Sequence, residues 1–574
     1  MKNRTFWFLF VGILALGAFL RFYDIKNIPI GLYPDEAMNG SNAQEGLATG
    51  NFHVFYPENN GREGLFMNVQ AISIAVFGPT PWALRLVSAV VGTLTILGVY
   101  LVTRELFPDP PPPVGFSDTS DGKKTGSSFS SRSRSIALIA AFFIATSYWH
   151  LNFSRIGFRA ICLPLFASFG LYWMLKAMRT SRIGDWVLSG IMIGLGFQTY
   201  IAFRFMPFVV MVPGILYLLK NRKAQSADRK GIHCGPCAIL LFIFVIFITA
   251  LPIGIYFLNH PQAFSGRSPT DQPISVFSTP SPIVAFLKSN LQTLGMFFVR
   301  GDCNWRHNYA CQPELHLIVA IFFVLGIWTG IRYLIHQRHE YTRFAIGTLF
   351  GWMVFMSLPE TLTKERIPHA LRSIGMIPPV MILAALGMWD ILHLILNWLE
   401  RQKSKYPAYH IQLHRIQREV GWLFVLLLLI IPLNTYYTYF LLWAGSKEAY
   451  FEFSTDYVHI GEYLNGIPDE TPKYIIVNRG GVDVRGIPSS AQTIMYLTNT
   501  FVDQNRIKKN YHYITPDNLS AIPDLTGTNA IVTFLNGSDQ ETKKRIKENH
   551  PELQKQFAPE IGRASCRERV YVLV

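Results

Sequence analysis

Charged residues are scarce in this chain. Acidic and basic residues together make up 16% of its 574 residues, whereas hydrophobic residues make up 50% and aromatic residues 14%. A soluble globular protein carries about 25% charged residues, so this composition excludes a soluble globule, and the length excludes a single domain. The composition instead indicates a chain that lies largely within a membrane.

Cysteine is also sparse, with six residues in the whole chain, too few for a disulfide framework. Cys303 and Cys311 share one long loop, and the sequence leaves open whether they are bridged. Cys234 and Cys237 form a Cys-x-x-Cys pair beside an apolar run, without a second pair of ligands. We interpret this pair as unpaired thiols at a helix start, rather than as a metal or redox site.

Apolar runs of about 20 residues, the length that crosses the hydrocarbon layer as a helix, recur along the first three quarters of the chain. The sequence therefore predicts an α-helical polytopic membrane protein. We expect about eleven transmembrane helices, at residues 5–23, 82–103, 136–151, 160–178, 185–201, 205–219, 237–257, 315–334, 344–358, 374–396 and 420–443.

The net charge of +15 does not indicate nucleic-acid binding, because the basic residues fall in short loops beside apolar runs. With Lys2 and Arg4 on the cytoplasmic side, alternating spans place the basic loops inside, as the positive-inside rule requires. No small-residue cleavage site follows the first span, so we interpret it as a retained anchor. The loops 258–313 and 359–372 then lie outside, and the protein is expected in the inner or plasma membrane.

The chain divides into parts of different composition. Residues 1–445 hold the apolar runs, interrupted at 108–134 by a proline-, serine- and lysine-rich stretch that we interpret as a disordered cytoplasmic loop. Residues 446–560 predict a small extracytoplasmic α/β domain, with strands near 474–477 and 530–535. Residues 561–574 resemble a non-native tail that recurs on translated gene fragments.

Polar clusters gather in the segments that this topology places outside. Asp35 and Glu36 follow the first span and are the candidate catalytic residues. Carboxylates beside guanidinium and imidazole groups suit transfer from a phosphate-linked donor, since the cations hold phosphate while a carboxylate deprotonates a hydroxyl. The candidate substrate- and phosphate-binding residues are Arg62, Arg155, Arg159, Asp302, Arg306, His307, His369 and Arg372.

Each cluster also has a structural interpretation. The two adjacent carboxylates can cap a helix that starts at Ala37, and outer arginines can contact lipid headgroups. Asp302 can cap its own turn or pair with Arg306. No spacing predicts a metal triad, so no metal or cofactor is predicted, although Asp35, Glu36 and Asp302 carry the oxygen ligands that a divalent cation would use.

Several motifs resemble the GT-C glycosyltransferases, in particular family 39, which includes protein O-mannosyltransferases and the lipid A aminoarabinose transferase. The resemblance covers about residues 5–445. Its carriers are the Asp35–Glu36 pair, Trp82-Ala83-Leu84-Arg85-Leu86, Ser154-Arg155-Ile156-Gly157-Phe158-Arg159, Gln198-Thr199-Tyr200 with Arg204, the 301–308 stretch and Ile367-Pro368-His369-Ala370-Leu371-Arg372-Ser373.

The resemblance implies inverting transfer of a sugar from a polyprenyl-phosphate donor to a lipid, glycan or protein acceptor outside the cytoplasm, with Asp35 as general base. Two features depart from it: Arg155 and Arg159 stand where many relatives have another acidic residue, and Arg62 stands nearest to a lysine of the aminoarabinose branch. The Trp-Trp-Asp motif of oligosaccharyltransferases is absent from the sequence. The alternative functions are a transporter or lipid flippase, and a protein whose outer domain binds envelope polymer.

Overall fold

The computed structural model of this chain describes residues 3–108, 132–221, 234–265, 275–336, 339–364, 366–526, 528–551, 553, 555–556 and 572–573. Most of the predicted cytoplasmic loop at 108–134 and most of the predicted tail at 561–574 lie outside these residues.

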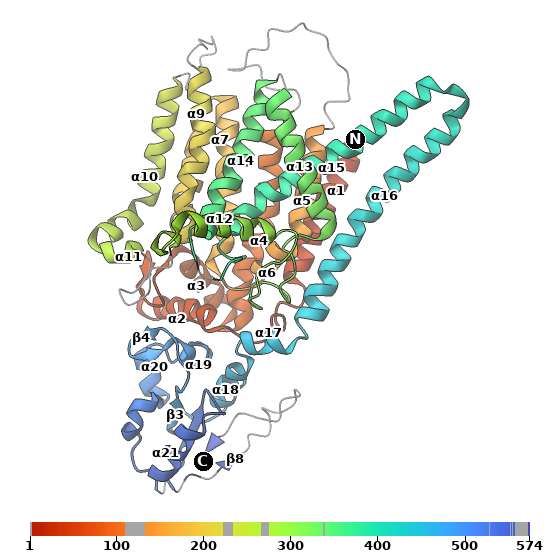
Figure 1. Ribbon diagram of the computed structural model, residues 1–574. Coiled ribbons are helices and arrows are strands. Elements are labelled where there is room, and N and C mark those ends of the chain that lie inside the picture. Colours follow the sequence, from red (N-terminus) through yellow and green to blue (C-terminus); the bar gives the residue numbers. More distant parts are fainter. Residues whose placement is uncertain are drawn as a thin grey trace.

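A bundle of long helices forms the body of the molecule (Figure 1). The helices are α1 (Asn3–Phe22), α4 (Pro81–Leu106), α5 (Arg132–Thr146), α7 (Cys162–Thr180), α8 (Ile183–Gly196), α9 (Met206–Asn221), α10 (Gly235–Asn259), α13 (Leu317–His336), α14 (Glu340–Thr361), α15 (Ile377–Lys405) and α16 (His410–Tyr436). A π-helical stretch, Tyr437–Trp443, continues α16.

The predicted polytopic helical fold is confirmed, because each of the eleven predicted spans coincides with a helix of this bundle. Eight helical segments of the described chain are long and apolar enough to cross a membrane. The other three predicted spans correspond to α5, α8 and α14. Of these, α5 and α8 have 15 and 14 residues, shorter than a full crossing requires.

Between α1 and α4 lies an outer segment made of α2 (Pro34–Thr49), β1 (Phe55–Tyr56), β2 (Arg62–Glu63) and α3 (Leu65–Phe77). Proline suits the first position of α2, and Gly50 ends this helix in the left-handed conformation, with φ of 74°. Figure 1 places α2 and α3 at the end of the bundle that faces the C-terminal domain.

The remaining outer loops carry short helices: α6 (Tyr148–Phe153), α11 (Pro261–Ser265) and α12 (Pro282–Gly295). After α12 the chain folds into a compact loop that a disulfide between Cys303 and Cys311 closes. A second disulfide joins Cys234 to Cys237 at the start of α10, so the interpretation of these two residues as unpaired thiols is wrong. The backbone turn at the start of the helix brings their α-carbons within 5.1 Å, which a disulfide can bridge.

The C-terminal domain contains a five-stranded sheet in the order β6-β3-β7-β9-β8. The two predicted strands are present as β3 and β7, which pair in parallel. The elements are α17 (Lys447–Glu452), α18 (Thr455–Asn465), β3 (Lys473–Ile476), β4 (Asp483–Val484), β5 (Ile487–Pro488), α19 (Gln492–Thr498), α20 (Asp503–Lys508), β6 (Tyr511–Ile514), β7 (Ile531–Phe534), α21 (Gln540–Asn549), β8 (Lys555–Gln556) and β9 (Val572–Leu573).

This domain docks on α2 through α19. Met38 of α2 is fully buried and belongs to the same apolar cluster as Ile460, Ile494 and other core residues of the domain. The side chain of Gln44 donates a hydrogen bond of 3.0 Å to the carbonyl of Tyr496. The helix that carries the acidic pair is therefore held between the bundle and the C-terminal domain.

Candidate active site

The first turn of α2 separates the two acidic residues. Asp35 lines a cavity of about 260 Å³, and its Oδ1 accepts a hydrogen bond of 2.7 Å from Asn59. Glu36 is fully buried, pairs with Arg85 at 2.8 Å and accepts a hydrogen bond of 2.8 Å from the backbone N–H of Gly157. Successive helix residues point about 100° apart, so one carboxylate faces the cavity and the other faces the core.

Helix capping does not account for these carboxylates. The N-cap of α2 is Tyr33, and no side chain makes a capping hydrogen bond there. Its ring lies 3.9 Å from the guanidinium carbon of Arg306, and burial, together with the charge of Asp35, raises the pKa of Tyr33 well above its usual value. The Tyr33 phenol therefore stays protonated in the cavity and is available as a donor.

Arg62 supplies a buried cation to the same cavity. Its guanidinium donates hydrogen bonds to the side-chain oxygens of Asn39, at 2.8 Å, and Asn42, at 2.5 Å. Burial, together with the charge of Arg159, lowers the pKa of Arg62 to about 10, so the group remains charged at neutral pH. Because amide oxygens are neutral acceptors, they orient Arg62 without cancelling its charge.

Arg159 and Arg306 complete the cationic wall. Arg159 lies at the start of a short 3₁₀ helix, Arg159–Ile161, and pairs with Glu63 of β2 at 3.0 Å. Arg306 donates a hydrogen bond of 3.1 Å to the side chain of Asn304 and lies 3.3 Å from Glu452 of α17. The three arginines come from separate outer loops, as the sequence predicted, and all line one cavity.

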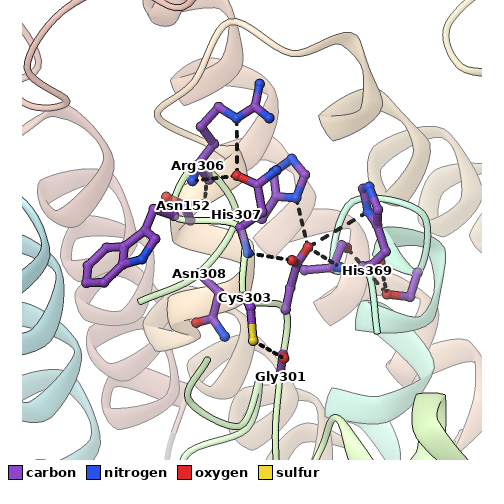
Figure 2. A network of polar contacts seen from close by, with 12 residues as sticks. Asn152, Gly301, Cys303, Arg306, His307, Asn308 and His369 are labelled. Atoms are coloured by element: carbon purple, nitrogen blue, oxygen red, sulfur yellow. Dashed lines mark hydrogen bonds and ion pairs between the residues drawn. The ribbon is translucent and has the colours of Figure 1, made fainter. Parts of the chain in front are cut away.

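His307 and His369 lie beside each other (Figure 2), and both lie close to Asp302. The Nδ1 of His307 is 2.8 Å from the Oδ2 of Asp302, which also accepts the N–H of Ala370 at 2.9 Å. Burial opposes ionisation of Asp302, but hydrogen bonding and the charge of the histidines bring its pKa below the ordinary value. Burial, with the nearby charges of His307 and Arg372, lowers the pKa of His369 well below its ordinary value, which favours its neutral form.

Six of the ten predicted site residues thus line the cavity: Asp35, Arg62, Arg159, Arg306, His307 and His369. The structure does not bring Arg155 there: its guanidinium donates to the backbone carbonyls of Leu20, Arg21 and Ile28 and packs on Phe440. This arginine ties the end of α1 to the loop that leads to α2.

The other predicted residues lie behind or beside the cavity. Arg372 donates a hydrogen bond of 2.9 Å to the hydroxyl of Thr363. The sequence left open whether Asp302 caps its turn or pairs with Arg306. Its Oδ1 does accept the N–H of Asn304 at 2.8 Å, and its Oδ2 contacts the Nδ1 of His307 at 2.8 Å, with no ion pair to Arg306 among the described residues.

Sequence reasoning missed several cavity residues. Asn59 and Asn60 adopt the left-handed conformation, with φ of 52° and 64°, immediately before Gly61. An Asn-Asn-Gly stretch is a turn signal, so the turn was predictable, although its contact with Asp35 was not. The other cavity residues that were not named as site residues are Tyr33, Asn39, Phe158, Ala160, Tyr200, Asn304, Arg366 and Leu371, of which Phe158, Tyr200, Asn304 and Leu371 lie in the motifs that carry the resemblance.

A second chamber of about 810 Å³ adjoins this cavity and shares Asn304, Arg306 and Arg366 with it. The rest of its lining is mixed: Arg300, Asp302 and Glu452 are charged, whereas Leu291 of α12 and Val299 are apolar. These two side chains are 72% and 77% exposed in the absence of a membrane. The shared wall therefore joins a small charged cavity to a larger chamber with an apolar rim.

Residues 129–250, from α5 into α10, match the family model described as dolichyl-phosphate-mannose-protein mannosyltransferase. No curated protein matches the chain. The structure of ArnT from Cupriavidus metallidurans bound to undecaprenyl phosphate is similar, with a TM-score of 0.56 and 14% identity over 98% of this chain and 97% of that chain. The structure of the same ArnT in the apo state is also similar, with a TM-score of 0.56 and 15% identity over 100% of this chain and 98% of that chain.

The similarity to ArnT covers 98% of this chain and therefore includes the C-terminal domain. The family match runs from α5 to α10 and includes two of the outer loops that carry cavity residues, with Arg159 in the first and Tyr200 in the second. The predicted resemblance is confirmed: this multi-pass membrane protein has the fold of the GT-C glycosyltransferases, and its family match identifies its enzyme class as glycosyltransferase.

Proposed function

We propose that this protein transfers a sugar from a polyprenyl-phosphate-linked donor to an acceptor hydroxyl on the extracytoplasmic side of the membrane, with Asp35 as general base. The observation that carries the proposal is the single cavity in which Asp35 faces Arg62, Arg159 and Arg306. Undecaprenyl phosphate is the ligand in one of the similar ArnT structures, which supports a lipid-phosphate donor.

In this reaction the acceptor oxygen attacks the anomeric carbon while the bond from that carbon to the phosphate oxygen breaks. The polyprenyl phosphate leaves with the bonding electrons, and the acceptor proton passes to Asp35. Attack from the face opposite the leaving group inverts the configuration. The arginines stabilise the charge that develops on the departing phosphate, because fixed cations in a site shielded from water need no reorganisation.

The adjoining chamber suits the lipid part of the donor. Its apolar rim lies beside α12, and its polar wall, with Arg306 and Arg366, is shared with the cavity that holds Asp35. A phosphate placed at this wall can reach the arginines while the tail remains in contact with apolar side chains and lipid.

The test is incubation of the purified protein with a panel of polyprenyl-phosphate sugars and candidate acceptors, scored by mass spectrometry. Loss of a general base typically costs 10²–10⁴-fold in rate, so Asp35→Asn is expected to reduce transfer by at least ~100-fold without preventing folding. The matched control is Asp24→Asn, since Asp24 lies in the same outer segment but bonds only locally, to Asn27.

An Asp35→Asn variant that keeps the wild-type rate would remove Asp35 from the role of base. An assay in reconstituted vesicles distinguishes the proposed glycosyltransferase from the alternative, a lipid flippase. Movement of a labelled lipid across the bilayer without a new glycosidic bond would favour a flippase over a transferase.

A further inference from the structure

Three side chains with metal-ligating atoms converge at the wall of the cavity. One ligand atom from each of Asp302, His307 and His369 lies within 4.8 Å of the other two. These residues come from two loops about 60 positions apart, so their meeting is a product of the fold and no local motif predicts it. Figure 2 shows the imidazole rings of His307 and His369 beside each other, and their centroids are 4.8 Å apart.

His369 holds a nitrogen that the surrounding residues leave unsatisfied. Its Nδ1 is buried and has no hydrogen-bond partner in the described part of the chain. The nearest carboxylate oxygen, the Oδ2 of Asp302, is 3.8 Å away, too far for a hydrogen bond. An unsatisfied buried polar atom is costly in free energy, so its presence calls for a partner that the protein itself does not supply.

The supporting residues hold the cluster rigidly. Backbone N–H groups of Asn304 and Ala370 fix the two oxygens of Asp302, at 2.8 and 2.9 Å. The disulfide of Cys303 closes the first loop, and the side chain of Glu360 accepts the N–H of His369 at 2.8 Å. Such outer contacts are the ones that orient the ligands of metal sites.

We propose that Asp302, His307 and His369 bind one divalent transition-metal ion, of which Zn²⁺ fits best. Two imidazoles with one carboxylate make a zinc set with an open fourth position, whereas Mg²⁺ and Ca²⁺ prefer oxygen ligands. Zinc bonds of about 2.0–2.2 Å require the side chains to draw closer and the ion to displace the proton between His307 and Asp302.

The ion would also have a role in the reaction, and this role rests on the proposed function. His307 and His369 both line the cavity, so an ion that they hold would lie at the wall of the cavity in which we place the donor phosphate. There the metal would act as a Lewis acid on a phosphate oxygen, together with Arg306.

The experiment measures metal rather than activity. Tag-free protein is loaded with Zn²⁺, dialysed against metal-free detergent buffer and analysed by mass spectrometry for metals, with Co²⁺ loading and visible absorption as a second readout. We expect about one Zn²⁺ per chain and the intense bands of a four-coordinate Co²⁺ site. His307→Gln, His369→Gln and Asp302→Asn are each expected to lose more than the 10–100-fold in affinity typical of outer-contact changes.

The control is His512→Gln, since His512 lies on β6 of the C-terminal domain, far from this cluster in the fold. Equal metal content in this control and the three ligand variants would overturn the inference, as would wild-type protein that retains no Zn²⁺. Asp35-dependent transfer at the full rate by metal-free protein would overturn the role of the ion in the reaction while leaving the proposed function standing. Bound Zn²⁺ without transfer to any acceptor would do the reverse.

Discussion

Asp35 and Glu36 have the same functional group and opposite surroundings. The Glu36 carboxylate and the Arg85 guanidinium are 0% and 1% exposed, and the same guanidinium donates to the backbone carbonyls of Pro29 and Gly31. An ion pair removed from water in this way is costly to break, because the remaining charge has no solvent to stabilise it. Glu36 therefore holds the site in place, whereas Asp35 is accessible to a substrate.

Glu36→Gln is expected to destabilise the folded protein by about 3–5 kcal/mol, since it leaves Arg85 charged and unpaired in the core. Thermal unfolding in detergent measures the effect. Asp35→Asn is the paired variant and should unfold within a few degrees of the wild type. Equal losses of stability in the two variants would contradict the division of roles between the carboxylates.

At the scale of single residues, the sequence indicated which groups gather on the outer face but not their partners. Asp302 and His307 were predicted as site residues, yet their direct contact depends on how the 301–311 loop closes. Arg155 lies in a sequence motif with Arg159. Only the packing of α1 against it reveals that Arg155 donates its hydrogen bonds to backbone carbonyls. Side-chain direction depends on helix phase and loop conformation, and neither follows from spacing alone.

At the scale of elements, the turn between β1 and β2 links the cavity to the C-terminal domain. Asn59 of this turn contacts Asp35, and the carboxylate of Glu58 lies 2.7 Å from Arg485. Arg485 also pairs with Glu45 of α2 at 2.7 Å. A single arginine of the C-terminal domain therefore joins the helix that carries Asp35 to the turn that positions it.

Arg485→Ala is expected to release this turn and weaken donor binding more than the chemical step. Half-exposed ion pairs contribute about 0.2–1 kcal/mol each, so the two pairs together predict a rise in KM of about 2-fold to 30-fold with kcat little changed. Initial-rate kinetics separate the two constants. Arg506→Ala, which breaks an exposed pair with Asp503 in the same domain, is the control. A matching rise in KM for the control would argue against the link.

The positions of the long helices were the most predictable feature, because a helix that crosses the hydrocarbon layer needs about 20 apolar residues and such runs are visible in the sequence. The short elements were harder to place. The outer loops at 301–308 and 366–372 were assigned to the same membrane face, but their contact through Asp302 and His369 required the packing of α12, α13 and α14.

At the scale of the whole molecule, the C-terminal domain and the turn between α15 and α16 lie at opposite ends of the bundle (Figure 1). The residues that the proposed mechanism needs on one face, Asp35 and His369, do line one cavity. The basic residues around Lys403 and Lys405 lie at the other end, which the predicted orientation assigns to the cytoplasmic side.

This orientation predicts opposite labelling of two exposed serines replaced by cysteine in a Cys566→Ser background. Ser538→Cys, in the C-terminal domain, should react with a membrane-impermeant maleimide added from outside. Ser404→Cys, at the end of α15, should react only after permeabilisation. Labelling of both sites from the same side would contradict the arrangement.

The position of Met38 limits which fragments of this protein can fold on their own. That side chain comes from α2, yet it fills a place among the inner residues of the C-terminal domain. Residues 446–560 produced alone would expose an apolar pocket in place of the Met38 side chain, and such fragments would self-associate through this pocket. The appended domain and the acid-bearing helix are, in folding terms, one inseparable piece.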